Sequence, residues 1–206
     1  LGDVYKRQPY TVAKTDSEKR AWELAESLDL DLRVINPGAV LGGSFVSPTP
    51  SVEFFPNIIS GKIPMAPKIP IPIVHVKDVA KAHRRAYEVD EAEGRFIVAP
   101  HKNLTFADVC KITRKLYPNS KATRIAIPRS LMFLAVLFDW ISGMKSGKRM
   151  MTRKRAKGLF KGDSNLSSDK ATKVLGIQWE SLESCIRDSV EAVSYTHLTL
   201  PTMFEV

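Results

Sequence analysis

Cysteine and histidine are scarce in this sequence. Its 206 residues contain two cysteines, Cys110 and Cys185, and four histidines, with no CxxC pair and no cluster of histidines. Zinc sites need several Cys or His ligands at short spacings, and disulfide frameworks need more cysteines than these. The sequence therefore predicts neither a metal site nor a disulfide framework, which fits a reducing, cytoplasmic compartment.

Long hydrophobic runs are also missing. The longest, LMFLAVLF at residues 131–138, ends at Asp139 and is shorter than the ~20 residues needed to cross a bilayer. One alternative is a peripheral membrane or partner-binding protein that docks through this segment and the basic run after it. Asp139 interrupts the apolar face, and short apolar helices usually pack in a core, so a membrane is not the favoured partner.

Acidic residues are absent from one stretch. Between Gly143 and Gly162 lie eight Lys and Arg residues and no Asp or Glu, in a chain whose net charge is +9. Nucleic-acid-binding modules combine basic patches with recognisable motifs or interleaved aromatic side chains, and neither accompanies this run. We interpret the stretch at 145–161 as a solvated face and expect no nucleic-acid partner.

The sequences of the two ends do not resemble native protein. Residues 1–8 and 193–206 resemble translations, in opposite orientations, of the transposon adapter used for shotgun sequencing libraries. We therefore expect the native sequence to be an internal fragment, at residues 9–192.

The motif PYTVAK places Tyr10 and Lys14 four residues apart on the first turns of a predicted long helix, whose amphipathic pattern extends from Thr11 to about Leu28. This spacing puts both side chains on one helix face. A cation within about 4–6 Å lowers the pKa of a tyrosine from about 10 by about 1–3 units, so the phenol can exchange a proton near neutrality. The spacing is common on helices, so the pair indicates catalysis only together with the segments that follow.

The next segments predict an α/β fold. Apolar residues of the helix recur every three or four positions, at Ala13, Ala21, Leu24, Ala25 and Leu28. A strand, LRVIN, follows, and then the loop NPGAVLGG at residues 36–43. A helix, a short link, a strand and a Gly/Pro loop form half of a βαβ unit, which favours a parallel sheet with a ligand at the carboxyl ends of its strands.

Further elements continue this alternation. Helices are predicted over residues 51–60, from Asp78, after Thr105, after Pro128, before Gly176 and from Ser181, with strands at residues 71–76, 95–99 and 122–128. Asp78 is expected to cap its helix, and Thr105 with Asp108 predicts a capping box. The last helix should turn Leu182, Cys185, Ile186 and Val190 toward a core.

Four segments together resemble the extended short-chain dehydrogenases/reductases. YTVAK, VINPGAVLGG, VHVKDVAKAH and NLSSDKATKVLG occur in the order and approximate spacing of that family, over essentially all of residues 9–192. Within it the chain most resembles the dihydroflavonol-reductase-like carbonyl reductases. The resemblance implies the end of a Rossmann domain at residues 9–44 and a substrate-binding region at residues 45–192, with returning Rossmann elements at about 71–99.

The resemblance also implies reduction of a ketone or aldehyde with NADP or NAD. Tyr10 is expected to donate a proton to the carbonyl oxygen, and Lys14 to hold the nicotinamide ribose. The other residues expected at the cofactor are Pro37, Gly38, Ala39, Val40 and Ser51. For Asn36 two roles remain open, contact with the substrate and a hydrogen bond to the loop backbone. His75 is expected to be a core side chain whose hydrogen bonds are made within the protein.

The family's glycine-rich phosphate loop, its ribose-discriminating residue and its catalytic Ser or Thr precede the tyrosine, and none is present here. We therefore expect the 206-residue chain to be inactive by itself, and NAD is not distinguished from NADP. A nucleotide-sugar epimerase or dehydratase of the same superfamily is the enzymatic alternative. The substrate is expected to be a small carbonyl compound, and a homodimer of the complete protein is left open.

Overall fold

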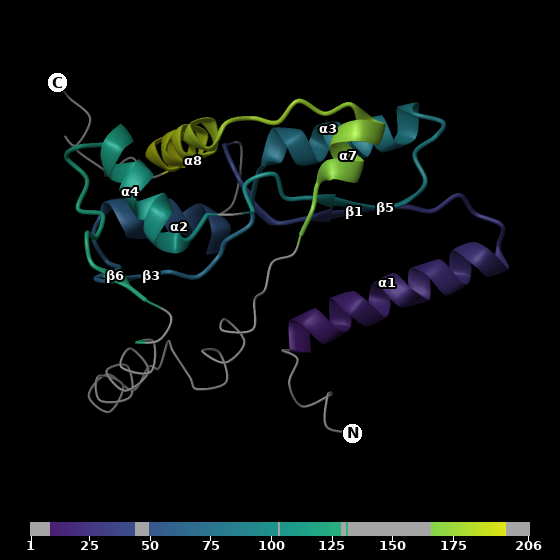
Figure 1. Ribbon diagram of the computed structural model, residues 1–206, viewed down its shortest axis with the longest axis horizontal. Helices are drawn as coiled ribbons and strands as arrows, with labels where there is room; N and C mark the ends of the chain where they lie inside the picture. Colours follow the sequence, from purple (N-terminus) through teal and green to yellow (C-terminus); the bar gives the residue numbers. More distant parts are fainter. Residues whose placement is uncertain (1–8, 44–49, 103, 129–130, 132–165, 197–206) are drawn as a thin grey trace.

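The computed structural model describes residues 9–43, 50–102, 104–128, 131 and 166–196 (Figure 1). The basic stretch at 145–161 lies outside these residues, as does nearly all of the expected apolar helix after Pro128. The adapter-like segments 1–8 and 197–206 lie outside them too, whereas residues 193–196 continue the last helix.

One part of the molecule is a parallel strand pair between helices. β1 (Arg33–Pro37) pairs in parallel with β5 (Gly94–Val98). Helices α3 (Val76–Glu88) and α7 (Asp169–Leu175) pack on the pair from one side, and α1 (Pro9–Ser27) lies on the other (Figure 1). A parallel pair with helices on both sides confirms the predicted α/β class.

The two faces of this pair differ in polarity. Side chains of paired residues project to the same face, so Phe96 and Val98 turn toward α3 and α7, whereas Asn36 and Arg95 turn toward α1. Phe96 and Val98 are fully buried. They belong to the α3–α7 core, which consists of Val74, Ala82, Ala86, Ala92, Phe96, Val98, Ala171, Leu175 and Ile177.

The second part contains α2 (Pro50–Ile59), α4 (Phe106–Leu116) and α8 (Leu182–Thr196), with two further parallel pairs. These are β2 (Ala39–Leu41) with β4 (Ile73–His75), and β3 (Ala66–Pro67) with β6 (Ala126–Ile127). The three helices share the α2–α4–α8 core, which consists of Leu41, Phe55, Ile58, Ile59, Ala66, Ile73, Phe106, Val109, Cys110, Ala122, Leu182, Cys185, Ile186 and Val190. None of the helices within the described ranges is both long and apolar enough to cross a bilayer.

The predicted apolar face of α1 is mostly uncovered. Ala25 is buried, but Leu24 and Leu28 are 40% and 62% exposed. The strand face beneath the helix carries Asn36 and Arg95, so among the described residues it offers polar partners to α1.

The predicted loop at residues 36–43 contains strand β2, which the sequence pattern did not indicate. The Gly38 amide donates to Val98 O (3.0 Å) on β5, and the next amide, of Ala39, donates to Pro72 O (2.7 Å) at the start of β4. The chain thus changes strand partner at Gly38. A Cβ at this position would lie 2.5 Å from Pro72 O, so only glycine permits the close approach.

Most local signals are confirmed. Thr105 and Asp108 form the capping box of α4, Gly176 ends α7 with φ +62°, and the four predicted core residues of α8 are buried. The strand predicted at residues 122–128 is reduced to two residues in β6, and the strand predicted at 71–76 to three in β4.

Candidate active site

Tyr10 and Lys14 lie on the first two turns of α1, as their spacing predicted. The side chain of Lys14 is exposed, and that of Tyr10 is outside the described part of the chain, as is that of Ser51 at the start of α2. The roles of these three residues therefore remain predictions.

Residues 37–40 stand where a ligand of an α/β sheet is expected, at the carboxyl end of β1. Pro37 and Ala39 are exposed there. The amides of Gly38 and Ala39 already donate within the strand pairs. Successive amides of a strand point in opposite directions, so the Val40 amide is directed away from β4.

Asn36 has a partner that the sequence did not suggest. Its Nδ2 donates to Oε2 of Glu18 on α1 (3.2 Å). Oε1 of the same carboxylate accepts from Arg95 Nε (2.6 Å) and from Trp22 Nε1 (3.3 Å). Partial burial alone would raise the pKa of Glu18, but the hydrogen bonds from Trp22, Arg95 and Asn36 hold it below its usual value.

Sequence reasoning missed Glu18, although its spacing carried a signal. Tyr10, Lys14, Glu18 and Trp22 follow one another at intervals of four residues, which keeps them near one face of α1. Asn36 immediately precedes Pro37. The contact of Glu18 with Asn36 therefore ties the face of α1 that bears the Tyr–Lys pair to the strand that leads into residues 37–40.

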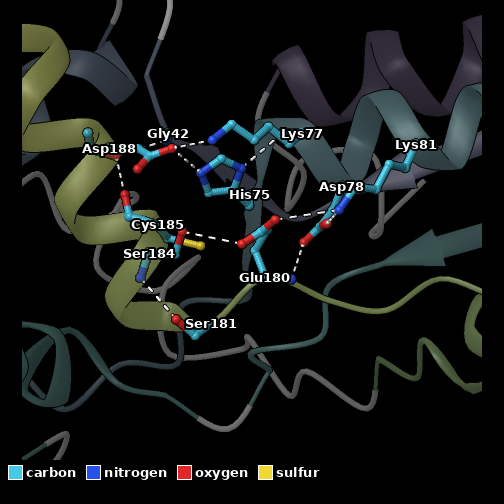
Figure 2. Close-up of polar contacts among 11 residues, drawn as sticks. Gly42, His75, Lys77, Asp78, Lys81, Glu180, Ser181, Ser184, Cys185 and Asp188 are labelled. Atoms are coloured by element: carbon cyan, nitrogen blue, oxygen red, sulfur yellow. Dashed lines mark hydrogen bonds and ion pairs between the residues drawn. The ribbon is translucent and has the colours of Figure 1, made fainter.

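His75 closes β4 and is fully buried (Figure 2). Its Nδ1 accepts a hydrogen bond from the Lys77 amide (3.0 Å) at the start of α3, which leaves the ring proton on Nε2 to be donated to Asp188 Oδ2 on α8 (3.2 Å). A ring with no exposed surface cannot reach a substrate. This confirms the prediction that His75 is a satisfied core group.

The predicted capping role of Asp78 is wrong, because His75 caps α3. Asp78 is fully buried, and its carboxylate accepts from the Glu180 amide (2.8 Å) and from Lys81 Nζ (3.3 Å) (Figure 2). His101 Nε2 contacts the carbonyl oxygen of Glu180 (2.9 Å). The residues preceding α8 are thus fixed by side chains that lie about 80 to 100 residues earlier.

No family model matches the chain. Curated relatives include the tetraketide alpha-pyrone reductase 2 of Arabidopsis thaliana, 34% identical over 111 residues, which are 53% of this chain and 34% of the relative. A cinnamoyl-CoA reductase of Medicago truncatula is 35% identical over 112 residues (53% and 33%), and an anthocyanidin reductase of Vitis vinifera is 32% identical over 123 residues (54% and 36%). The chain spans about a third of the length of these relatives.

Solved structures share the fold over more of the chain. A nucleoside-diphosphate-sugar epimerase from Pseudomonas aeruginosa has a TM-score of 0.68 at 18% identity, over 92% of this chain and 56% of the epimerase. Vestitone reductase from alfalfa has a TM-score of 0.61 at 20% identity (91% and 52%). The yeast methylglyoxal/isovaleraldehyde reductase complexed with NADPH has a TM-score of 0.57 at 23% identity (87% and 48%). The relatives named above are plant reductases, and the solved structures that share the fold include reductases and an epimerase, so the chain resembles the extended short-chain dehydrogenases/reductases in sequence and in fold.

Proposed function

We propose that this chain is part of an NAD(P)-dependent reductase that converts a ketone or an aldehyde to an alcohol. The supporting observation is the hydrogen bond between Glu18 and Asn36, which brings the helix face bearing Tyr10 and Lys14 to β1, the strand that leads into residues 37–40. The reductase names of the relatives are consistent with this assignment.

The residues of the chain have separate tasks in this reaction. Tyr10 donates its proton to the carbonyl oxygen of the substrate, and Lys14 favours the phenolate that results and holds the nicotinamide ribose. The Val40 amide, directed away from β4, is available to the nicotinamide carboxamide. When bound, the reduced nicotinamide supplies the hydride for the carbonyl carbon.

A nucleotide-sugar epimerase or dehydratase uses the same pair of residues, and one of the structures with this fold is an epimerase. The relatives above 30% identity are reductases, which favours reduction. The chain's sequence contains no glycine-rich phosphate loop, so we expect the 206-residue chain alone to show no turnover.

The proposal is tested with the complete protein, encoded by the uninterrupted reading frame that contains this chain. It is assayed with NADPH and with NADH against a panel of aldehydes and ketones, and separately against UDP-sugars. We expect oxidation of one dinucleotide with a carbonyl substrate, and a decrease in kcat of about 10²- to 10⁴-fold in Tyr10→Phe. Conversion of UDP-sugars without carbonyl reduction would favour the epimerase instead.

Tyr87→Phe is the matched control. Tyr87 lies on α3 with 87% of its surface exposed, so removal of its hydroxyl should leave kcat unchanged. Equal turnover of the wild type and Tyr10→Phe would eliminate Tyr10 as the proton donor.

A further inference from the structure

The carboxylate of Glu18 joins three elements around the candidate site. Its Oε1 accepts from Arg95 on β5 and from Trp22 one turn further along α1, and its Oε2 accepts from Asn36 on β1. Both oxygens are engaged, so one side chain holds α1 against both strands of the pair.

Within the described part of the chain, few side chains of α1 are buried. Among residues 12–27, Ala25 is the only buried one, and Leu24 is 40% exposed. On the opposite face of the strand pair, Phe96 and Val98 are fully buried in the α3–α7 core. Among the described residues the strands are thus packed on one face by apolar side chains, whereas hydrogen bonds of Glu18 join α1 to the other face.

Glu18 lies close in sequence to both parts of the candidate site. It follows Lys14 by one turn and Tyr10 by two, about 6 and 12 Å along the helix axis. Its partner Asn36 directly precedes Pro37. A tilt of about 10° at Glu18 would move Tyr10 by about 2 Å, and a displacement of about 1 Å in an active site can lower the rate about 10²-fold.

We propose that Glu18 is a positioning residue, which fixes the register and tilt of α1 on β1 and thereby the distance of Tyr10 and Lys14 from residues 37–40. The inference rests on the proposed function for its effect on turnover. Its structural content, that Glu18 holds α1 on the strand pair, is independent of any activity.

In the complete protein, Glu18→Ala should lower kcat by roughly 10- to 100-fold. The KM for the carbonyl substrate should change by less than about threefold, because the substituted residue does not touch the substrate. Tyr10 and Lys14 move together on one helix, so the pH at which kcat falls off should stay at its wild-type value. An unchanged kcat would overturn the proposal, and so would a loss accompanied by a shift of this pH, which would indicate a direct electrostatic effect on Tyr10.

Glu23→Ala is the matched control on the same helix. Glu23 pairs with Arg20 at 2.8 Å, and both side chains are more than 60% exposed. Its removal should leave kcat unchanged. Exchange of the paired charges, Glu18→Arg with Arg95→Glu, restores only the ion pair, because arginine cannot accept from Trp22 or Asn36. The double variant should be more active than Glu18→Arg alone; equal activity would argue against the ion pair as part of the anchor.

Hydrogen exchange supplies a measurement without turnover. The amides of α1 should exchange at least about tenfold faster in Glu18→Ala than in Glu23→Ala, whereas the amides of β5 keep their protection. Equal protection of α1 in the two variants would overturn the proposal even if kcat changed. If the complete protein reduces no carbonyl compound, the proposed function fails, and the exchange result still decides the role of Glu18.

Discussion

The ring of His75 lies 3.2 Å from the carboxylate of Asp188, which follows it by 113 residues. Lys77 forms an ion pair with the same carboxylate at 2.8 Å. The two contacts join α8 to the junction of β4 and α3 (Figure 2). Gly42 lies at the same place: its amide donates to Ser189 Oγ, and a Cβ there would meet the His75 ring at 3.0 Å. The end of β2 and the last helix are therefore held by one polar cluster.

The Asp188 contacts predict a pH-dependent stability. The hydrogen bond from Lys77 and its charge hold the pKa of Asp188 below its usual value, so the folded state binds this proton less tightly than the unfolded state. The stabilisation is present above about pH 4, the unfolded pKa, and is lost as the pH falls through the lower folded value. Asp188→Asn should lower the free energy of unfolding by about 1 kcal/mol at pH 7, a value limited by the exposure of Lys77.

Urea unfolding at pH 7 and at pH 3 measures this effect. The difference between the variant and the wild type should shrink at pH 3. Asp16→Asn, at an exposed position of α1, is the control and should change little at either pH. A difference of the same size at both pH values would refute the assignment.

The capping box of α4 provides a second prediction. Thr105 Oγ1 accepts from the Asp108 amide and donates to the Asp108 carboxylate (2.6 Å), which lowers the pKa of Asp108. Thr105→Ala should reduce the free energy of unfolding by about 1 kcal/mol, whereas Thr105→Ser should retain most of it. Thermal unfolding of the two variants at pH 7 distinguishes them, and equal stability would mean that the hydroxyl is not the cap.

Two glycines should respond to alanine for different reasons. Gly38→Ala places a Cβ against the Pro72 carbonyl and should cost about 1–3 kcal/mol by overpacking. At Gly94 a Cβ meets only Lys170 Nζ, at 3.8 Å, but φ is +71°, so Gly94→Ala should cost about 1 kcal/mol through backbone conformation alone. Denaturant unfolding gives both values, and a Gly38→Ala variant as stable as the wild type would show that β2 can leave β4 without penalty.

Both cysteines should be inert in the folded protein. Cys110 and Cys185 are at most 1% exposed, and burial raises the pKa of their thiols to about 11 and about 12. Because the thiolate is the reactive form, a thiol reagent at pH 8 should modify neither residue in the native protein and both after unfolding in urea. Rapid labelling of either one before unfolding would contradict this burial.

Predictions from nearby residues succeeded. The Thr105–Asp108 box depends on residues three positions apart, and the inward face of α8 follows from helical periodicity. Each of these patterns is specified within a few turns of helix. They do not depend on the location of the rest of the chain.

Predictions failed where a distant partner decided the outcome. Asp78 is of a residue type that often caps helices, but its carboxylate oxygens accept from the Glu180 amide, 102 residues later, and from Lys81. The Gly/Pro pattern predicts a loop where β2 lies, because the pairing of β2 with β4 is visible only in three dimensions. The spacing of Glu18 places it on the helix face of Tyr10 and Lys14, but its contacts with Asn36 and Arg95 are not predictable, because no local pattern shows which strands face α1.

The placement of α7 and α8 has a consequence for protein synthesis. Ala171, Leu175 and Ile177 complete the α3–α7 core, and the last buried residue of the α2–α4–α8 core is Val190. Neither core can close on the ribosome until these late residues have left the exit tunnel. Until then Phe55 and Phe96 lack their final apolar partners, and exposed apolar side chains of this kind are what makes incomplete chains prone to aggregation.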